Sequence, residues 1–455
     1  MPVIQPAKSK FRDNTSNNPN MNRYHLTLLS ATLLAAGLSS TLHAQTEIPP
    51  ADPWNVKSVD SADYPKATAN EPHFENKELW PEEIQKAGFI KQTWPKTRVL
   101  VWAGGTNKVS DGWEAKYWIE DGKPATVPFD ENTDLVFPDN EGGFTWVSLT
   151  AGRKYQPAAF RHLTLGKGCG VIGHFSVGGN TWIKKGGNVQ YLDSCVGKGN
   201  TFLRNDNDDI NLVDHFHFNK APGWSCEFIG RFSSGDNWQI NSGLMILSTD
   251  SRIGTGNRTD TTINEDGALA ILSGSYFSRR LNADWGFDLI VKGKFSAGLP
   301  DRPLIRDARL GLGYKSKGSF INKSGEPGNR TPSPADFSMI VTETGSFNVF
   351  ADAAGKARLI VNCHKLEPDW GQLGIQWRNR ELDPVAGRAA AEAVPRLSDM
   401  VLLGKADMSN VRFEDIAKGG IHMANPAMAS QWNNVELGAN NGGTLKELVA
   451  PYKKP

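Results

Sequence analysis

The feature of this sequence that most constrains its fold is a long series of short apolar runs separated by glycine and asparagine. Runs such as GVIGHFSV, NTWIKK, NVQYL and NTFLRN follow one another from about Phe160, and similar runs continue to ARLIVNC, which ends at Cys363. Runs of this length with turn residues between them predict β-strands rather than helices. Glycine, at 46 of 455 residues, exceeds its usual share of about 7% and supplies the turns. The sequence therefore predicts an all-β fold: a solenoid, a sandwich or a barrel.

Internal repeats favour the solenoid. A hexad of glycine, a basic residue, Phe-Ser, any residue and glycine occurs three times, beginning at Gly173, Gly230 and Gly293. Later glycine–aromatic units, at Gly274, Gly293, Gly318 and Gly345, lie 19, 25 and 27 residues apart. Such intervals are typical of one coil of a right-handed parallel β-helix, in which each coil covers the apolar residues of the coil before it. We therefore expect the hexad phenylalanines, Phe175, Phe232 and Phe295, to point inward.

The ends of the chain differ in composition from this central part. Residues 1–44 are expected to be a signal peptide region, with translation starting at Met21, an apolar stretch from Leu26 to Leu38 and cleavage near Ala44. The protein is then secreted, periplasmic or on the cell surface, and its apolar stretch is too short for a membrane span. Residues 45–98 are predicted to be an extended lead-in with a short capping helix from Trp80. Residues 99–366 are the predicted β-helix.

The last segment, residues 367–455, is predicted to hold the final coils and a C-terminal cap. Three stretches of it are typical of short helices: Ala386–Val394, Val411–Gly420 and the segment beginning at Thr444. A cap is expected because an exposed solenoid end invites pairing with another chain. The four cysteines are too few for a disulfide scaffold, and a formal net charge of +1 gives no support to a nucleic-acid partner.

The segment Trp113–Pro138 (WEAKYWIEDGKPATVPFDENTDLVFP) resembles the opening segment of exported bacterial β-solenoids. The runs INEDGALAILSGSYFS, LIVKGKFSAG and IVTETGSFNVF are similar to repeats of passenger-type surface proteins and of pectin-lyase-like enzymes. The resemblance covers about residues 99–363. It implies a right-handed parallel β-helix with a surface suited to carbohydrate, and it singles out no specific enzyme family.

The densest polar cluster is the segment from Asn205 to Asn219, NDNDDINLVDHFHFN. Alternate residues of a strand share one face, so carboxylates here can meet a hard cation such as Ca²⁺. The expected metal ligands are Asp206, Asp208 and Asp214. His215 and His217 also share a face, which suits acid–base chemistry or a transition metal. The alternative is a solvated loop with two surface histidines.

A basic patch follows between Arg279 and Lys317, where nine basic residues outnumber four acidic ones. Arginine binds carboxylate or sulfate groups through two hydrogen bonds, and an indole can stack on a sugar ring. The expected substrate-binding residues are Arg279, Trp285, Lys292 and Lys294. The alternative is a solvent-facing charged loop.

Three other features are expected to be structural. Trp182 and Trp238 occur at similar places in the repeats and are interpreted as packing positions. Cys169 and Cys195 lie 26 residues apart, near one coil, and are predicted to stack or to form a disulfide, which sequence alone does not decide. Cys226 and Cys363 are interpreted as small buried residues.

These observations favour a secreted carbohydrate-active protein that binds and depolymerises an extracellular, acidic polysaccharide. The expected catalytic residues are Asp208, Asp209, His215 and Arg280. In a lyase, a cation or arginine neutralises a uronate while a base removes the α-proton. In a hydrolase, two carboxylates would instead cleave the glycosidic bond. The alternative function is a non-catalytic adhesion or glycan-binding solenoid.

Overall fold

The computed structural model describes seventeen stretches of the chain, all within the larger of two compact units, Ile48–Pro455. They are residues 98–103, 110–149, 158–207, 211–213, 216–234, 238–255, 261–279, 289–312, 315–316, 320–321, 327–328, 338–362, 396–397, 400–414, 416, 418–438 and 441–453. The signal peptide region, the helix from Trp80 and the helix Ala386–Val394 lie outside these residues. Within them, no helix has the length and apolar character that crossing a membrane requires.

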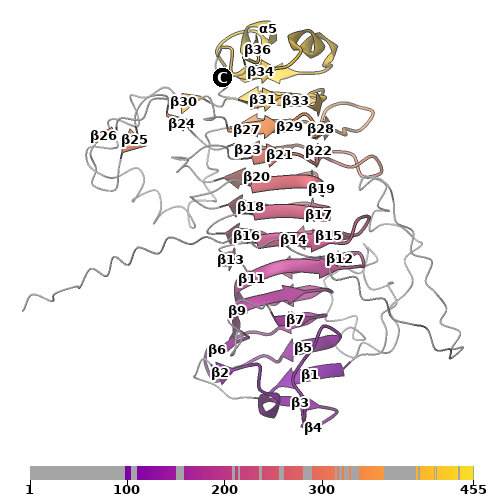
Figure 1. Cartoon of the computed structure of the whole chain (residues 1–455), viewed down its shortest axis with the longest axis vertical. Helices are drawn as coiled ribbons and strands as arrows, with labels where there is room; N and C mark the ends of the chain where they lie inside the picture. The colour runs from indigo at the N-terminus through magenta and orange to yellow at the C-terminus, as the bar shows by residue number, and fades with distance from the viewer. Residues whose placement is uncertain are drawn as a thin grey trace, which may run out of the picture. The chain divides into compact units, whose positions relative to one another are not determined.

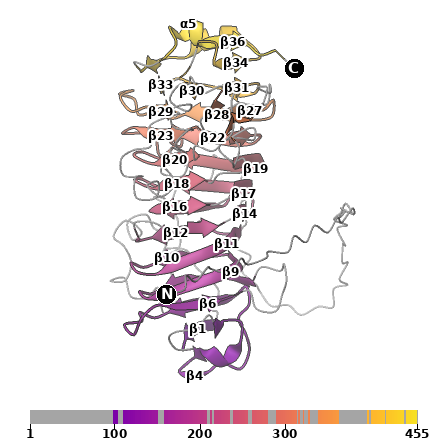
Figure 2. The ribbon, with the colours of Figure 1, turned by 90° about the vertical axis from the view of Figure 1, so that its left-hand side faces the viewer.

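The described residues form an all-β structure built mainly from parallel pairs. One sheet has 24 strands and another has eight, and two further pairs of short strands complete the described set. Figures 1 and 2 show most of the strands stacked in chain order, with β4 at one end and β34 and β36 near the other; Figure 1 shows β25 and β26 to one side of the stack. The parallel pairs divide into three ladders, and four long strands (β9, β11, β17 and β19) bend to take part in two of them.

Ladder 1 pairs, in order, β1 (Arg98–Trp102), β5 (Thr133–Phe137), β8 (Leu163–Leu165), β10 (Thr181–Ile183), β12 (Thr201–Asn205), β15 (Ser225–Ile229), the ends of β17 (Trp238–Leu247) and β19 (Thr261–Ile271), β22 (Lys294–Ala297), β28 (Ser346–Val349) and β32 (Lys405–Ala406).

Ladder 2 pairs β7 (Ala158–Phe160), the ends of β9 (Cys169–Val177) and β11 (Asn188–Gly197), β14 (Phe216–Lys220), the starts of β17 and β19, β21 (Leu289–Val291), β27 (Met339–Val341), β31 (Met400–Leu402), β34 (Ile421–Met423) and β36 (Val449–Pro451).

Ladder 3 has two parts. The first pairs β2 (Ser110–Asp111), β6 (Thr145–Ser148) and the starts of β9 and β11. The second is the eight-stranded sheet of β13 (Asn211–Val213), β16 (Arg231–Ser234), β18 (Arg252–Thr255), β20 (Tyr276–Arg279), β23 (Ala308–Gly311), β29 (Leu359–Asn362), β33 (Val411–Glu414) and β35 (Glu436–Leu437).

The remaining elements are short. Antiparallel pairing joins β3 (Trp118–Glu120) to β1 and to β4 (Lys123–Pro124), β24 (Lys315–Ser316) to β30 (Arg396–Leu397), and β25 (Phe320–Ile321) to β26 (Pro327–Gly328). The described helical elements are η4 (Ala115–Tyr117), η6 (Pro426–Gln431) and α5 (Leu445–Leu448).

The chain visits ladders 1, 3 and 2 in turn, as in the succession β12, β13, β14, β15, β16 and β17. Register partners on ladder 1 are separated in the sequence by close to one predicted repeat, as Leu163 and Thr181 are, or Leu269 and Phe295. The interval then lengthens, because the next partner of Phe295 is Phe347, and the connection between their strands includes β24, β25 and β26.

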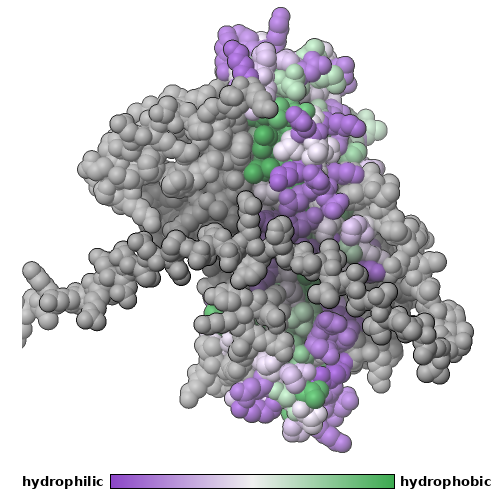
Figure 3. Space-filling model, in the orientation of Figure 1, coloured by the Kyte–Doolittle hydropathy of each residue, from purple (hydrophilic) through white to green (hydrophobic). Residues whose placement is uncertain are grey.

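Few large apolar side chains are exposed among the described residues. Figure 3 shows mainly hydrophilic residues along one face of the strands, with a smaller hydrophobic area among them. The large apolar side chains that are exposed in the described ranges are Val127, Phe144, Ile305 and Met428, which are scattered along the sequence. Most other large apolar side chains of these ranges are buried, the majority in the interior and a few in a separate cluster that includes Leu244, Ile246 and Leu272.

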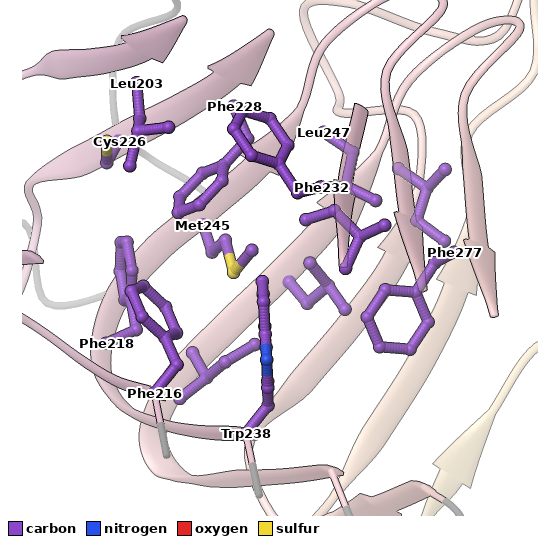
Figure 4. Packing of buried hydrophobic residues seen from close by; sticks show 14 of the residues in the cluster. Leu203, Phe216, Phe218, Cys226, Phe228, Phe232, Trp238, Met245, Leu247 and Phe277 are labelled. Atoms are coloured by element: carbon purple, nitrogen blue, oxygen red, sulfur yellow. The ribbon is translucent and has the colours of Figure 1, made fainter. Parts of the chain in front are cut away.

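Apolar side chains from all three ladders form one interior cluster. Phe175, Phe232 and Phe295 are at most 1% exposed, so the prediction that they point inward is confirmed. They lie on β9, β16 and β22, which belong to ladders 2, 3 and 1. Each hexad therefore combines a glycine at a corner with an inward phenylalanine. The three hexads do not occupy equivalent positions in successive turns of the chain. Figure 4 shows this interior packing around Trp238, Phe216 and Phe228.

The helix predicted for Val411–Gly420 is wrong over its first residues, which form the strand β33. Val411 and Phe413 are buried, whereas Arg412 and Glu414 are half-buried. This period of two requires a strand, and pairing with β29 fixes it. The predicted helix after Thr444 is confirmed as α5, where Glu447 and Thr444 form a capping box.

Lys220 is a charged side chain inside the apolar interior. It ends β14 with no exposed surface, and its Nζ donates a 2.9 Å hydrogen bond to the carbonyl oxygen of Gly178. Burial lowers the pKa of this amine below its ordinary value of 10.5. The hydrogen bond to the Gly178 carbonyl oxygen therefore offsets part of the cost of burying the Lys220 amine.

We expect Lys220→Met to raise the free energy of unfolding by about 1 kcal/mol or more at neutral pH, because a buried charge is replaced by an apolar chain of similar length. The unfolded chain binds more protons than the folded one between the lowered pKa and the ordinary pKa, so the stability of the wild type rises with pH over that interval. The variant should lack this rise. Urea unfolding at several pH values checks it, and a variant with the wild-type pH dependence would contradict it.

Candidate functional site

Most of the predicted site residues lie outside the described part of the chain. These are Asp208, Asp209, Asp214, His215, Arg280 and Trp285. Arg279 is the last residue of β20, although its side chain is not among those described. Asp206, Lys292 and Lys294 are described in full.

Asp206 follows β12 and is held by two side chains. Its Oδ2 accepts a 2.7 Å hydrogen bond from the indole Nε1 of Trp182, and its Oδ1 accepts one of 2.5 Å from Nε of Arg204. Trp182 and Arg204 are register partners on β10 and β12, so their side chains lie on the same face of ladder 1. The Asp206 carboxylate thus holds the indole of Trp182 and the guanidinium of Arg204 beside each other. Binding a metal ion through the same two oxygens would disturb these hydrogen bonds.

Basic and acidic groups extend this cluster along the same corner. Nζ of Lys184 lies 5.4 Å from the ring centroid of Trp182 and 3.9 Å from Oδ1 of Asp139. We name Asp139, Trp182, Lys184, Arg204 and Asp206 the Trp182 cluster. It joins a half-buried indole to charged groups at the surface, a combination that suits a sugar with an acidic substituent.

Trp182 and Trp238 are not equivalent, which corrects the sequence interpretation. Trp238 lies on ladder 2 with no exposed surface, and its ring centroid is 4.7 Å from that of Phe216. Trp182 lies on ladder 1 and bonds to Asp206 instead. The reason is that Trp182 occupies the outward set of its strand, whereas Trp238 occupies the inward set.

Lys292 and Lys294 lie at the corner between β21 and β22, where Lys292 is exposed and Lys294 is half-buried. Lys294 begins β22, which is four strands beyond β12 on ladder 1. At about 4.8 Å per strand, this separation is about 19 Å. The structure therefore does not bring Asp206 and these lysines together.

A column of arginines runs along ladder 3 instead. Arg231 is the register partner of Arg252, which pairs with Tyr276, and Tyr276 pairs with Arg309. The same column continues from Arg309 through Ile360 to Arg412, and we name Arg231, Arg252, Arg309 and Arg412 the arginine column. The strands that carry it follow one another in Figure 2.

The four arginines are half-buried and point away from the interior, because each precedes an inward apolar residue in its strand. Those residues are Phe232, Ile253, Leu310 and Phe413. With about 4.8 Å between strands, Arg231 and Arg252 are neighbours, and the next two arginines follow at intervals of about 10 Å. The column spans about 24 Å. A line of guanidinium groups suits a linear polyanion, and one of the four, Arg412, also forms a 3.1 Å ion pair with Glu414.

Two basic residues of the predicted patch form ion pairs with distant acidic residues of the chain. Arg302 forms two hydrogen bonds, of 3.0 and 3.1 Å, with the carboxylate of Glu227, which is buried. Arg306 bonds to Asp250 at 2.8 Å. Among the residues of the predicted patch that the structure describes, Arg309 lies in the arginine column.

The strand β13, which lies between the two halves of the predicted acidic cluster in the sequence, belongs to the same eight-stranded sheet as the strands of the arginine column. Asp208 and Asp209 precede β13 in the sequence, and Asp214 and His215 follow it. β13 pairs with β16, the strand of Arg231. Arg280 directly follows β20, which is two strands further along that sheet. Strands next to several of these predicted residues in the sequence therefore lie on ladder 3 with the arginine column, whereas Lys292 and Lys294 of the basic patch lie at the corner before ladder 1.

For the predicted calcium site, Asp206 is the one ligand that the structure describes. In the described ranges, no three His, Cys, Asp or Glu side chains lie close enough together to hold a metal ion. Sequence reasoning missed the arginine column, because the register is needed to see it. The available signal was an arginine directly before an inward residue in RFSS, RIGT, ARLG and VRFE.

The chain was compared with known protein families, with curated proteins and with solved structures, and none of the three comparisons gives a match.

Proposed function

We propose that this protein is an exported right-handed parallel β-helix that binds an acidic polysaccharide along the arginine column. The β-helix is supported by the regular succession of ladders 1, 3 and 2, with parallel register throughout the three ladders. Export is supported by the signal-peptide pattern of residues 1–44.

The arginine column is the observation that carries the proposal. Linear polysaccharides with uronate or sulfate groups present anions at regular intervals, and guanidinium groups pair with such anions through two hydrogen bonds. A near-neutral chain has no general attraction for polyanions, so a local line of cations has to provide it. The Trp182 cluster adds an indole and charged groups on ladder 1.

A second function, depolymerisation of the bound chain, is supported by the position of β13. The predicted catalytic residues Asp208, Asp209 and His215 flank this strand, which neighbours the strand of Arg231. A carboxylate or imidazole there would act on a polymer held by the column, with a uronate neutralised by Arg280. The non-catalytic alternative keeps the binding surface and lacks this chemistry.

Binding is tested with the double variant Arg252→Gln/Arg309→Gln. Its affinity for polygalacturonate, alginate or heparin should be at least about tenfold weaker than that of the wild type, since each charge-assisted hydrogen bond contributes more than about 1 kcal/mol. The matched control is Lys123→Gln/Lys405→Gln, which removes two exposed charges away from ladder 3. Wild-type binding should also weaken with salt.

Equal weakening in the two double variants, or no binding of any acidic polymer, would contradict the proposal. The same samples test depolymerisation through new reducing ends and the absorbance of new double bonds. Turnover that is lost in Asp208→Asn while binding remains would support the catalytic function. Binding without turnover in the wild type would favour the non-catalytic alternative.

A further inference from the structure

Two described cysteines lie beside each other in the interior. Cys195 is on β11 and Cys226 is on β15; they are 3% and 1% exposed, and their side chains share a hydrogen bond. Cys195 is the register partner of Phe218 in β14, and Cys226 is the partner of Thr201 in β12. The two thiols therefore come from successive turns of the chain, on either side of the corner between ladders 2 and 1.

Figure 4 shows Cys226 inside the structure beside Leu203, among the buried hydrophobic side chains. Cys169 lies elsewhere: it is on the ladder 3 part of β9, opposite Thr145, and its Sγ lies 3.3 Å from the carbonyl oxygen of Pro138. Cys169 and Cys195 are separated in the sequence by about one predicted coil, but they lie on different ladders. They therefore do not stack on one another as the sequence suggested. All three described cysteines are free thiols.

The surroundings make the two thiols chemically unequal. The hydrogen bond with Cys226 and burial together raise the pKa of Cys195 well above its usual value. Burial opposes ionisation of Cys226 as well, but the hydrogen bond from Cys195 and the charge of Lys220 outweigh it and lower its pKa.

We propose that Cys195 and Cys226 are a redox-active pair that forms a disulfide inside the protein, linking two successive turns of the chain. The oxidant is an external disulfide, either a small molecule or the active-site disulfide of a folding catalyst. The Cys226 thiolate attacks one sulfur of that disulfide and releases the other as a thiolate. Cys195 then attacks Cys226 and releases the second thiolate.

In this exchange, the two protons of the cysteine thiols pass to the two released thiolates. The pair loses two electrons, and the external disulfide gains them. Because both sulfurs are buried, the exchange takes place while the chain folds or when this part of it opens locally. Once formed, the buried disulfide is protected from reductants. It closes the loop from Cys195 to Cys226 and should raise the melting temperature by several degrees.

The test is oxidative refolding of the full chain in a glutathione redox buffer, followed by unfolding, alkylation and mass spectrometry. Two unalkylated cysteines and a proteolytic peptide that joins Cys195 to Cys226 are expected. A variant with Cys169→Ala and Cys363→Ala should retain the linkage and the gain in melting temperature. Cys195→Ala and Cys226→Ala should each abolish both.

Four alkylated cysteines after oxidative refolding would overturn the proposal, and so would a link from either residue to Cys169 or Cys363. Peptide mapping of the wild type decides this even where an alanine variant fails to fold. The proposal is independent of glycan binding, because the pair lies in the interior and away from the arginine column.

Discussion

Asp134→Asn is expected to lower the free energy of unfolding by about 3–5 kcal/mol, the usual cost of removing one partner from a buried ion pair. Asp134 and Arg161 have side chains that are 0% and 5% exposed. Arg161 donates from Nε to Oδ1 at 2.7 Å and from its terminal nitrogen to Oδ2 at 2.5 Å. The substitution leaves the guanidinium charge buried without its counter-charge. Guanidinium chloride unfolding followed by circular dichroism measures the loss.

Two further variants make this prediction specific. Glu141→Gln breaks the ion pair with Lys167, in which the side chains of Glu141 and Lys167 are 77% and 58% exposed. This substitution should lower the free energy of unfolding by less than about 1 kcal/mol. The double variant Asp134→Asn/Arg161→Met should recover part of the loss, because it removes the buried charge as well. A loss of similar size at both ion pairs would show that burial is not its cause.

Gly345→Ala is expected to cost about 3 kcal/mol, at the upper end of the usual range for overpacking. Gly345 forms the corner between β27 and β28, and a Cβ there would lie 2.1 Å from the carbonyl oxygen of Val291 on the preceding turn of the chain. A backbone oxygen in a paired strand cannot move aside without disturbing its hydrogen bonds. Thermal and denaturant unfolding measure the effect.

Gly178→Ala is the matched control, because a Cβ at that position has its nearest neighbour at 3.8 Å, in ordinary contact with the carbonyl oxygen of Phe160. This variant should change stability by less than about 0.5 kcal/mol. If Gly345→Ala were as stable as this control, successive turns of the chain would not approach each other as closely at the corner as the structure places them.

Much of the fold was predictable because alternation along a strand is a local property. The inward positions of Phe175, Phe232 and Phe295 and the strand starting near Val99 follow from short-range patterns. The ladder to which each strand belongs depends on loop lengths, and these vary from turn to turn. The three hexads therefore lie on three ladders, although their sequences match.

The candidate site was less predictable, since it depends on register between distant residues. Arg252 and Arg309 are far apart in the sequence, yet only β20 lies between their strands on ladder 3. The charge excess from Arg279 to Lys317 indicated a basic patch, whereas Arg302 and Arg306 bond to Glu227 and Asp250. Charge counting along the sequence cannot separate basic residues in such ion pairs from those of a binding surface.

The most direct test of the central claim is the affinity of the protein for acidic oligosaccharides of defined length. Because the arginine column spans about 24 Å, affinity should rise with oligosaccharide length until the ligand covers that span and should then level off. Arg252→Gln/Arg309→Gln should flatten this rise. An affinity that is independent of length in the wild type, or a rise that the double variant retains in full, would contradict polysaccharide binding along ladder 3.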